Sequence, residues 1–214
     1  MNKKIVLFDF DGVIVDSFEI GYQVARKLYP GLTREMEKNF FNGNIYGSVK
    51  QIIKKNFFTK AEKSFSTEYV PKLLELSPIR GVKKTLGELE KLYQLIIVSS
   101  TISSPINEYL NRYNLAQYFD AIMGGDVHKS KTVKIQMVLD QSKAGPEDCV
   151  FITDTLGDMK EAAQCNIKSI GVTWGFHERE RLEKGNFFAL VDAIEELSPT
   201  IHSFFAKEKL IKKL

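Results

Sequence analysis

Two aspartates, Asp9 and Asp11, stand one residue apart at the end of an apolar run in this 214-residue chain. The preceding run Ile5–Phe8 is partly β-branched and predicts a buried strand that delivers both acids to the edge of a sheet. Two carboxylates this close repel each other, so the pair indicates a bound cation or a chemical role. The spacing suits a nucleophile, Asp9, with Asp11 as a proton shuttle and a metal ion between them. The alternative is an acidic turn before a helix cap, but Gly12 and the apolar Val13–Val15 make a poor solvated turn.

Hydroxyl groups follow the next apolar run, Leu95–Val98, as Ser99, Ser100 and Thr101. We expect them at the same sheet edge as Asp9, where an oxygen-rich substrate needs hydrogen-bond donors. Ser99 would donate to a phosphoryl oxygen, and Ser100 and the backbone N–H groups of the turn would add further contacts. Capping of the following helix is an alternative role for these hydroxyls.

A lysine-containing turn follows the third apolar run, Ala121–Met123. A lysine directed into a cleft of carboxylates would offset their repulsion and bind a phosphate oxygen. Lys131 is the first candidate for this role and Lys129 the second. An ordinary surface position is the alternative for either residue.

Two more acids, Asp154 and Asp158, follow the apolar run Val150–Thr153 and flank a turn that contains Gly157. Carboxylate oxygens are the ligands that hard divalent cations prefer, and Mg²⁺ takes few of them while keeping several waters. Asp154 is the predicted direct ligand, whereas Asp158 would bind through water or hold the loop. Asp158 also suits the first turn of a helix, where the helix dipole favours an acid, and the two roles are compatible.

Apolar runs that alternate with helical patterns predict an α/β fold with a doubly wound parallel sheet. Ser169–Thr173 supplies a fifth predicted strand. Residues 16–77 break this rhythm and predict a small all-helical cap domain, so that residues 1–15 and 78–197 form the α/β core. Residues 198–214 predict an amphipathic helix that extends the core, with a partner or membrane-surface role as the alternative.

Composition excludes several functional classes. The net charge of +3 is small and the basic residues are scattered, which argues against nucleic-acid binding. No apolar segment approaches the length of a membrane span, and the N-terminal run is interrupted at Asp9 before it could form a signal peptide. The two cysteines show neither metal spacing nor a disulfide framework, so we expect a cytoplasmic protein. No pattern specifies an oligomeric state.

Four motifs, at the ends of the predicted strands before Asp9, Ser99, Lys131 and Asp154, together resemble those of a known family in their order. Phe8–Ser17 is similar to the first signature of the haloacid-dehalogenase-like hydrolases, most of which are phosphatases. Lys131–Ile135 is similar to the third motif, in its form without a following proline, and Val150–Asp158 resembles the fourth. The resemblance covers about residues 1–197, and the cap is matched only by position and helical character. It implies a Rossmann-like core with a helical cap, similar to phosphoglycolate-phosphatase-like members.

The resemblance also implies a Mg²⁺-dependent phosphatase that acts on a small phosphorylated metabolite. Asp9 would attack phosphorus to give an aspartyl-phosphate, Asp11 would protonate the leaving alkoxide and then activate water, and Ser99 and Lys131 would stabilise the phosphoryl oxygens. The backbone carbonyl of Asp11 would join the metal ligands. Because dehalogenases of this family lack the second acid, Asp11 favours phosphoryl transfer over carbon–halogen cleavage. The residues assigned to the metal site are Asp9, Asp11, Asp154 and Asp158.

Other functions fit the same motifs less well. A phosphosugar mutase on this scaffold would pass the phosphoryl group to substrate instead of water, and a non-catalytic metabolite-binding protein is a third possibility. Receiver domains combine similar residues, but they are shorter and do not carry the acceptor aspartate in their first strand. Two further segments could approach the cleft: the loop Asn42–Gly47, which could equally be a plain interhelical turn, and Trp174–Arg179, in which we expect His177 at the surface.

Overall fold

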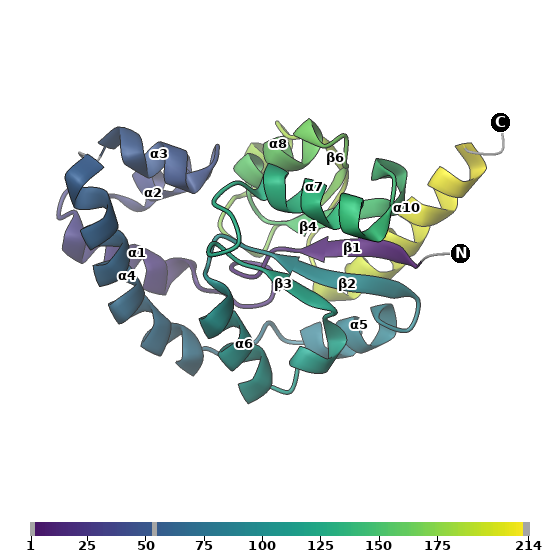
Figure 1. Cartoon of the computed structure of the whole chain (residues 1–214), viewed down its shortest axis with the longest axis horizontal. Helices are drawn as coiled ribbons and strands as arrows, with labels where there is room; N and C mark the ends of the chain where they lie inside the picture. Colours follow the sequence, from purple (N-terminus) through teal and green to yellow (C-terminus); the bar gives the residue numbers. More distant parts are fainter. Residues whose placement is uncertain (1–2, 53–54, 212–214) are drawn as a thin grey trace.

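Six strands form one parallel sheet in the computed structural model, which describes residues 3–52 and 55–211 (Figure 1). The strand order is β3-β2-β1-β4-β5-β6, which confirms the predicted α/β class. The sixth strand was not predicted, because a short apolar run such as FFALV fits a strand or a buried helix segment equally well. The strands are β1 (Lys4–Phe8), β2 (Tyr93–Val98), β3 (Ala121–Met123), β4 (Cys149–Thr153), β5 (Ser169–Val172) and β6 (Phe187–Val191).

Helices cover both faces of the sheet. Successive side chains of a strand point to opposite faces, and in the central strands the side chains on both faces are apolar, so both faces must be buried. Val6 and Phe8 of β1 pack against α5 (Val82–Leu89), α6 (Ser103–Arg112) and α10 (Leu197–Ile211), while Ile5 and Leu7 pack against α7 (Lys131–Ser142) and α8 (Leu156–Gln164). Figure 1 shows α7 and α8 on one face of the sheet and α5 and α6 on the other. The remaining short elements are α9 (Arg179–Leu182) and the 3-10 helices Ala116–Tyr118, Pro146–Asp148 and Ile194–Glu196.

A layer of four helices lies beside the carboxyl ends of the strands (Figure 1). The chain passes from the core into this layer after Val15 and comes back to the core at Pro78, and these two residues pair as an isolated antiparallel bridge. The backbone N–H of Ile79 also donates to the carbonyl of Ile14 at 2.9 Å. Between these connections, the described residues form helices and turns, as predicted for residues 16–77. The helices are α1 (Phe18–Leu28), α2 (Arg34–Phe40), α3 (Ile45–Ile52) and α4 (Lys55–Glu75).

The C-terminal helix α10 packs on the chain's own core. Ile201, Phe204 and Phe205 are buried, and the ring of Phe205 lies 5.0 Å from that of Tyr93. The described part of α10 thus lies against the core, and residues 212–214 of the predicted extension lie outside the described part of the chain. Of the helices described, none combines the length and the apolar character needed to cross a bilayer. Cys149 and Cys165 are buried and not bonded to each other.

Candidate active site

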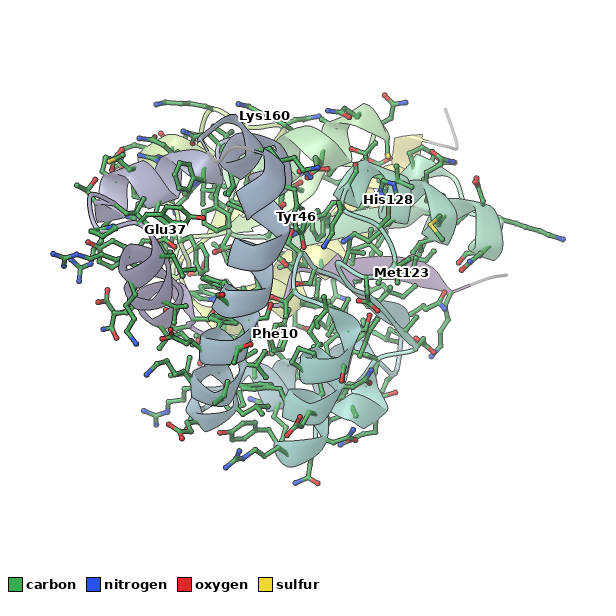
Figure 2. All side chains as sticks on the ribbon, turned by 60° about the vertical axis from the view of Figure 1, so that its left-hand side comes forward. Phe10, Glu37, Tyr46, Met123, His128 and Lys160 are labelled. Carbon is green, nitrogen blue, oxygen red and sulfur yellow. The ribbon has the colours of Figure 1, made fainter. Side chains whose placement is uncertain are left out.

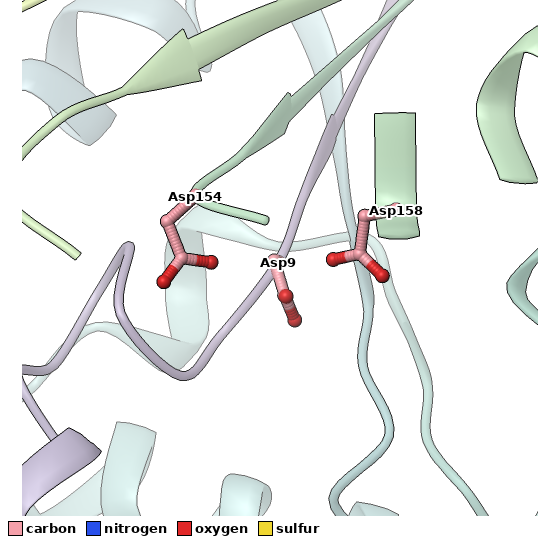
Figure 3. Close-up of side chains that lie close together, drawn as sticks. All are labelled: Asp9, Asp154 and Asp158. Atoms are coloured by element: carbon pink, nitrogen blue, oxygen red, sulfur yellow. The ribbon is translucent and has the colours of Figure 1, made fainter. Parts of the chain in front are cut away.

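Three aspartates converge at the carboxyl ends of two neighbouring strands. Asp9 follows β1, Asp154 follows the adjacent β4, and Asp158 lies in the first turn of α8 (Figure 3). One carboxylate oxygen of each lies within 4.8 Å of the others, and all three side chains are buried. The parallel pairing of β1 with β4 brings the first and fourth motifs together, since both strands end at the same edge of the sheet.

Lys131 is the cation of this cluster. Its Nζ lies 2.7 Å from Oδ2 of Asp9 and 2.6 Å from Oδ2 of Asp158, and the lysine is only 2% exposed. Ser130 caps α7 by accepting a hydrogen bond from the N–H of Val133, which places Lys131 in the first helical turn. The second candidate, Lys129, instead places its Nζ 4.3 Å from the centre of the Tyr46 ring. The structure therefore brings Lys131, and not Lys129, to the acids.

The three acids ionise unequally. Burial raises the pKa of Asp9 well above its ordinary value, and Asp158 adds to this shift against the opposing charge of Lys131. Burial also opposes ionisation of Asp158, but Lys131 and the surrounding hydrogen bonds hold its pKa below the ordinary value. Burial raises the pKa of Asp154 to about 7. The single positive charge of Lys131 is therefore not enough to balance three ionised carboxylates.

The donor set of this cluster fits a divalent metal ion. Oδ2 of Asp154 accepts from the backbone N–H of Phe176 at 2.7 Å, whereas its buried Oδ1 has no hydrogen-bond partner among the described residues. Such an orphaned carboxylate oxygen beside a second acid suits a hard cation that prefers oxygen ligands. Asp158 is less available, because its Oδ2 already accepts from Lys131 and from the Thr153 hydroxyl at 2.8 Å.

Gly12 allows the first motif to pass close to Asp154. Its φ of +74° lies in the left-handed region, which favours glycine. A Cβ at this position would also collide with the Asp154 carboxylate. The glycine that follows Asp11 is therefore required both by the turn and by the position of the acid on the neighbouring strand.

Asp11 lines the same cavity as Asp9 but points its carboxylate toward hydroxyl groups instead of the acidic cluster. Oδ1 accepts from Ser17 at 2.7 Å and from the Tyr69 hydroxyl of α4, and Oδ2 accepts from Thr101 at 2.7 Å. The sequence analysis did not identify Tyr69, because nothing local marks one tyrosine of a long helix as facing a site more than fifty residues away. The three hydroxyls hold the acid at the boundary between sheet and helices.

Ser99 is fully buried below the cavity, and its Oγ accepts from the backbone N–H of Thr101 at 3.0 Å. Its carbonyl accepts a hydrogen bond from Nζ of Lys134, which also donates to the carbonyl of Gly124 at 3.4 Å. Burial, with Lys131 nearby, lowers the pKa of Lys134 to about 8. Lys134 was missed as a positioning residue, although it lies one helical turn beyond Lys131, where a second inward-facing lysine was foreseeable.

The segment Asn42–Gly47, whose last three residues begin α3, lies against the core. Nδ2 of Asn44 donates to the carbonyl of Lys129 at 3.0 Å and to the carboxylate of Glu161, and the hydroxyl of Tyr46 donates to the carbonyl of Ser100 at 2.6 Å. Figure 2 labels Tyr46 where the helical layer meets the core. The turn before α3 and the first residues of α3 therefore close one side of the site.

The expectation of a surface position for His177 is wrong. The side chain is fully buried; its Nδ1 accepts from the backbone N–H of Leu156 at 3.0 Å, and its Nε2 lies 2.9 Å from the carbonyl of Lys38 in α2. Burial lowers the pKa of His177 to about 4, so the neutral ring serves as acceptor on one side and donor on the other. The histidine joins the fourth motif to the helical layer, a long-range contact that its charged sequence neighbours did not indicate.

The family model described as haloacid dehalogenase-like hydrolase matches residues 6–172, which include all four motifs. The chain belongs to the haloacid dehalogenase-like hydrolases. This confirms the resemblance stated from the motifs, within a slightly shorter range than expected.

Several known proteins are similar to the chain over most of its length. A phosphoglycolate phosphatase from Vibrio parahaemolyticus is 22% identical, with 91% of this chain and 94% of the relative covered. A haloacid dehalogenase-like hydrolase from Streptococcus pneumoniae has the same fold, with a TM-score of 0.76 at 22% identity over 93% of this chain and 98% of that one. A Thermotoga maritima structure assigned as a β-phosphoglucomutase aligns with a TM-score of 0.68 at 22% identity, covering 94% and 99% of the two chains.

Proposed function

We propose that this hydrolase is a Mg²⁺-dependent phosphatase that acts on a small phosphorylated metabolite through an aspartyl-phosphate intermediate. The observation that carries the proposal is the buried Asp9 carboxylate, which lies 2.7 Å from Lys131 and beside an unpartnered oxygen of Asp154. The cavity at the carboxyl ends of the strands thus holds a nucleophile (Asp9), a cation that can bind phosphate (Lys131) and an acid that can bind a metal ion (Asp154). The phosphatase names of relatives such as the Vibrio enzyme support the same activity.

The residues that would hold the metal ion are Asp9 and Asp154, with the Asp11 backbone carbonyl as a further ligand. Asp158 would orient Lys131 and contribute to the metal site from farther away, because its carboxylate is engaged with Lys131 and Thr153. When bound, Mg²⁺ supplies the positive charge that lets an anionic nucleophile approach a phosphate ester.

The chain's own groups account for the remaining chemistry. Asp9 attacks phosphorus in line, and Lys131 and Ser99 stabilise the equatorial oxygens as charge spreads over them. Asp11 donates a proton to the departing oxygen and afterwards accepts one from the attacking water. Residues 16–77 serve as the cap that encloses these steps, and residues 1–15 and 78–197 form the catalytic core.

Phosphate release should depend on a divalent cation. We expect the enzyme to release inorganic phosphate from a panel of phosphomonoesters with Mg²⁺, to lose the activity in EDTA, and to regain it when Mg²⁺ is added back. Release that persists unchanged in EDTA would contradict the proposal. An isomerised sugar phosphate without free phosphate would instead identify the mutase, and ligand binding without turnover would identify a non-catalytic protein.

Substitution Tyr69→Phe removes one of the three hydroxyl donors to Asp11. We expect kcat to fall about tenfold, since a hydrogen bond to a charged group contributes about 1.5–3 kcal/mol and two donors remain. The matched control is Tyr22→Phe, because the Tyr22 hydroxyl is also buried in the helical layer but bonds to the carbonyl of Leu32. Steady-state kinetics of both variants test the role of Asp11, and equal losses would argue for a structural effect alone.

A further inference from the structure

The cavity above the acids is far larger than a phosphate group requires. It encloses about 570 Å³ and extends from the strand ends into the helical layer. This volume falls within the range of ~300–1,000 Å³ that is typical of small-molecule sites. Most of the space must therefore receive the part of the substrate that leaves with the ester oxygen.

The walls of this space are mainly apolar. Met36 and Ile102, which are 46% and 39% exposed, are among the most exposed large apolar side chains in the described part of the chain, and both line the cavity. Leu28, Leu32, Phe40 and Val49 line it as well. Apolar surface gathered inside an accessible cavity is typical of a binding site for an apolar group.

In the described part of the chain, the same walls carry no positively charged side chain away from the catalytic centre. Among the residues whose side chains the structure describes, Lys131 is the single cation that lines the cavity, and Asp9 and Asp158 already engage it. A carboxylate on the leaving group would be buried without a counter-charge, which is strongly unfavourable.

Glu37 adds a polar group to the apolar part of the cavity. It projects from α2, is 7% exposed, and its Oε2 has no hydrogen-bond partner among the described residues (Figure 2). Burial, with Glu19 nearby, raises the pKa of Glu37 to about 8, so near neutrality it is mostly uncharged and able to donate a hydrogen bond. The Glu37 carboxyl can therefore form a hydrogen bond with a hydroxyl or amide group of a ligand, but it adds no positive charge to the cavity.

We propose that the substrate is a phosphate monoester of an uncharged and mostly apolar alcohol, with an aryl or branched alkyl body and one hydrogen-bonding group for Glu37. This inference rests on the proposed phosphatase function. It distinguishes this chain from enzymes for phosphoglycolate, whose leaving group carries a carboxylate that these walls would not neutralise.

The test compares benzyl phosphate, para-carboxybenzyl phosphate and phosphoglycolate by phosphate release in Mg²⁺. The two benzyl esters have similar leaving groups and differ mainly in the remote charge. We expect kcat/KM for benzyl phosphate to exceed both others by about tenfold or more. Preference for either carboxylated ester would overturn the inference and leave the phosphatase intact, whereas failure to hydrolyse any phosphomonoester would overturn the proposed function itself.

Two variants test the walls directly. Met36→Arg places a cation in the cavity at a half-exposed position and should raise kcat/KM for para-carboxybenzyl phosphate relative to benzyl phosphate by about tenfold. Leu92→Arg is the matched control, because Leu92 is 57% exposed and does not line the cavity.

Glu37→Leu should reduce kcat/KM for para-hydroxymethylbenzyl phosphate more than for benzyl phosphate. Unchanged ratios in both cavity variants would overturn the inference.

Discussion

Replacing Asp9 by asparagine should abolish phosphate release, with kcat lower by about 10⁴-fold or more, because the nucleophile itself is removed. The amide keeps the shape of the carboxylate but cannot form the aspartyl-phosphate. We also expect the thermal unfolding midpoint in metal-free buffer to be no lower than that of the wild type. The reason is that burial and neighbouring acids already disfavour the charged form of Asp9.

The matched control is Asp16→Asn, which makes the same chemical change at an exposed acid of the same motif. Its kcat should stay within a few-fold of the wild-type value. Trapping of a phosphorylated protein by rapid acid quench would complete the test, since label should appear on the wild type and not on Asp9→Asn. Turnover by Asp9→Asn at the wild-type rate would show that another group attacks phosphorus.

The second large effect is expected for Lys131→Met, which keeps the length of the side chain and removes its charge. Because Lys131 bonds both Asp9 and Asp158, kcat/KM should fall by about 10²–10³-fold, as when one transition-state donor is lost. The free energy of unfolding in metal-free buffer should fall by about 3 kcal/mol, because two buried acids would lose their partner. Chemical denaturation measures this change.

Lys129→Met is the control for this experiment. Its ammonium lies over the Tyr46 ring and not among the acids, so both activity and stability should change little. A larger loss of activity in Lys129→Met than in Lys131→Met would reverse the assignment of the cleft lysine. The pair therefore tests the choice between the two residues that the sequence alone left open.

The parallel core and the acids at its edge could be predicted because their signals are local. Asp9 and Asp154 each follow directly on a buried apolar strand, and the ends of parallel strands meet at one edge whatever the intervening chain does. The order of the motifs then sufficed to identify the family. In contrast, β6 carries no chemistry and its short apolar run fits more than one structure.

The residues contributed by the helical layer could not be predicted in the same way. Tyr69 and Glu37 lie in α4 and α2, and which sides of these helices face the cavity is fixed only when the helices pack against one another and against the strand ends. His177 was misplaced for a related reason, because its two hydrogen-bond partners come from distant parts of the chain. Periodicity identifies which side of a helix is buried, but it does not show whether that side faces a core or a cavity.

The two chain connections between the core and the helical layer pair with each other at Val15 and Pro78. A hydrogen bond from the backbone N–H of Ile79 to the carbonyl of Ile14 holds the two connections side by side. If residues 16–77 act as the proposed cap, we expect them to move relative to the core by rotating about this paired connection. We expect such a rotation to carry α2 and α3 together, so that product exit and entry of the next ester would depend on the same movement.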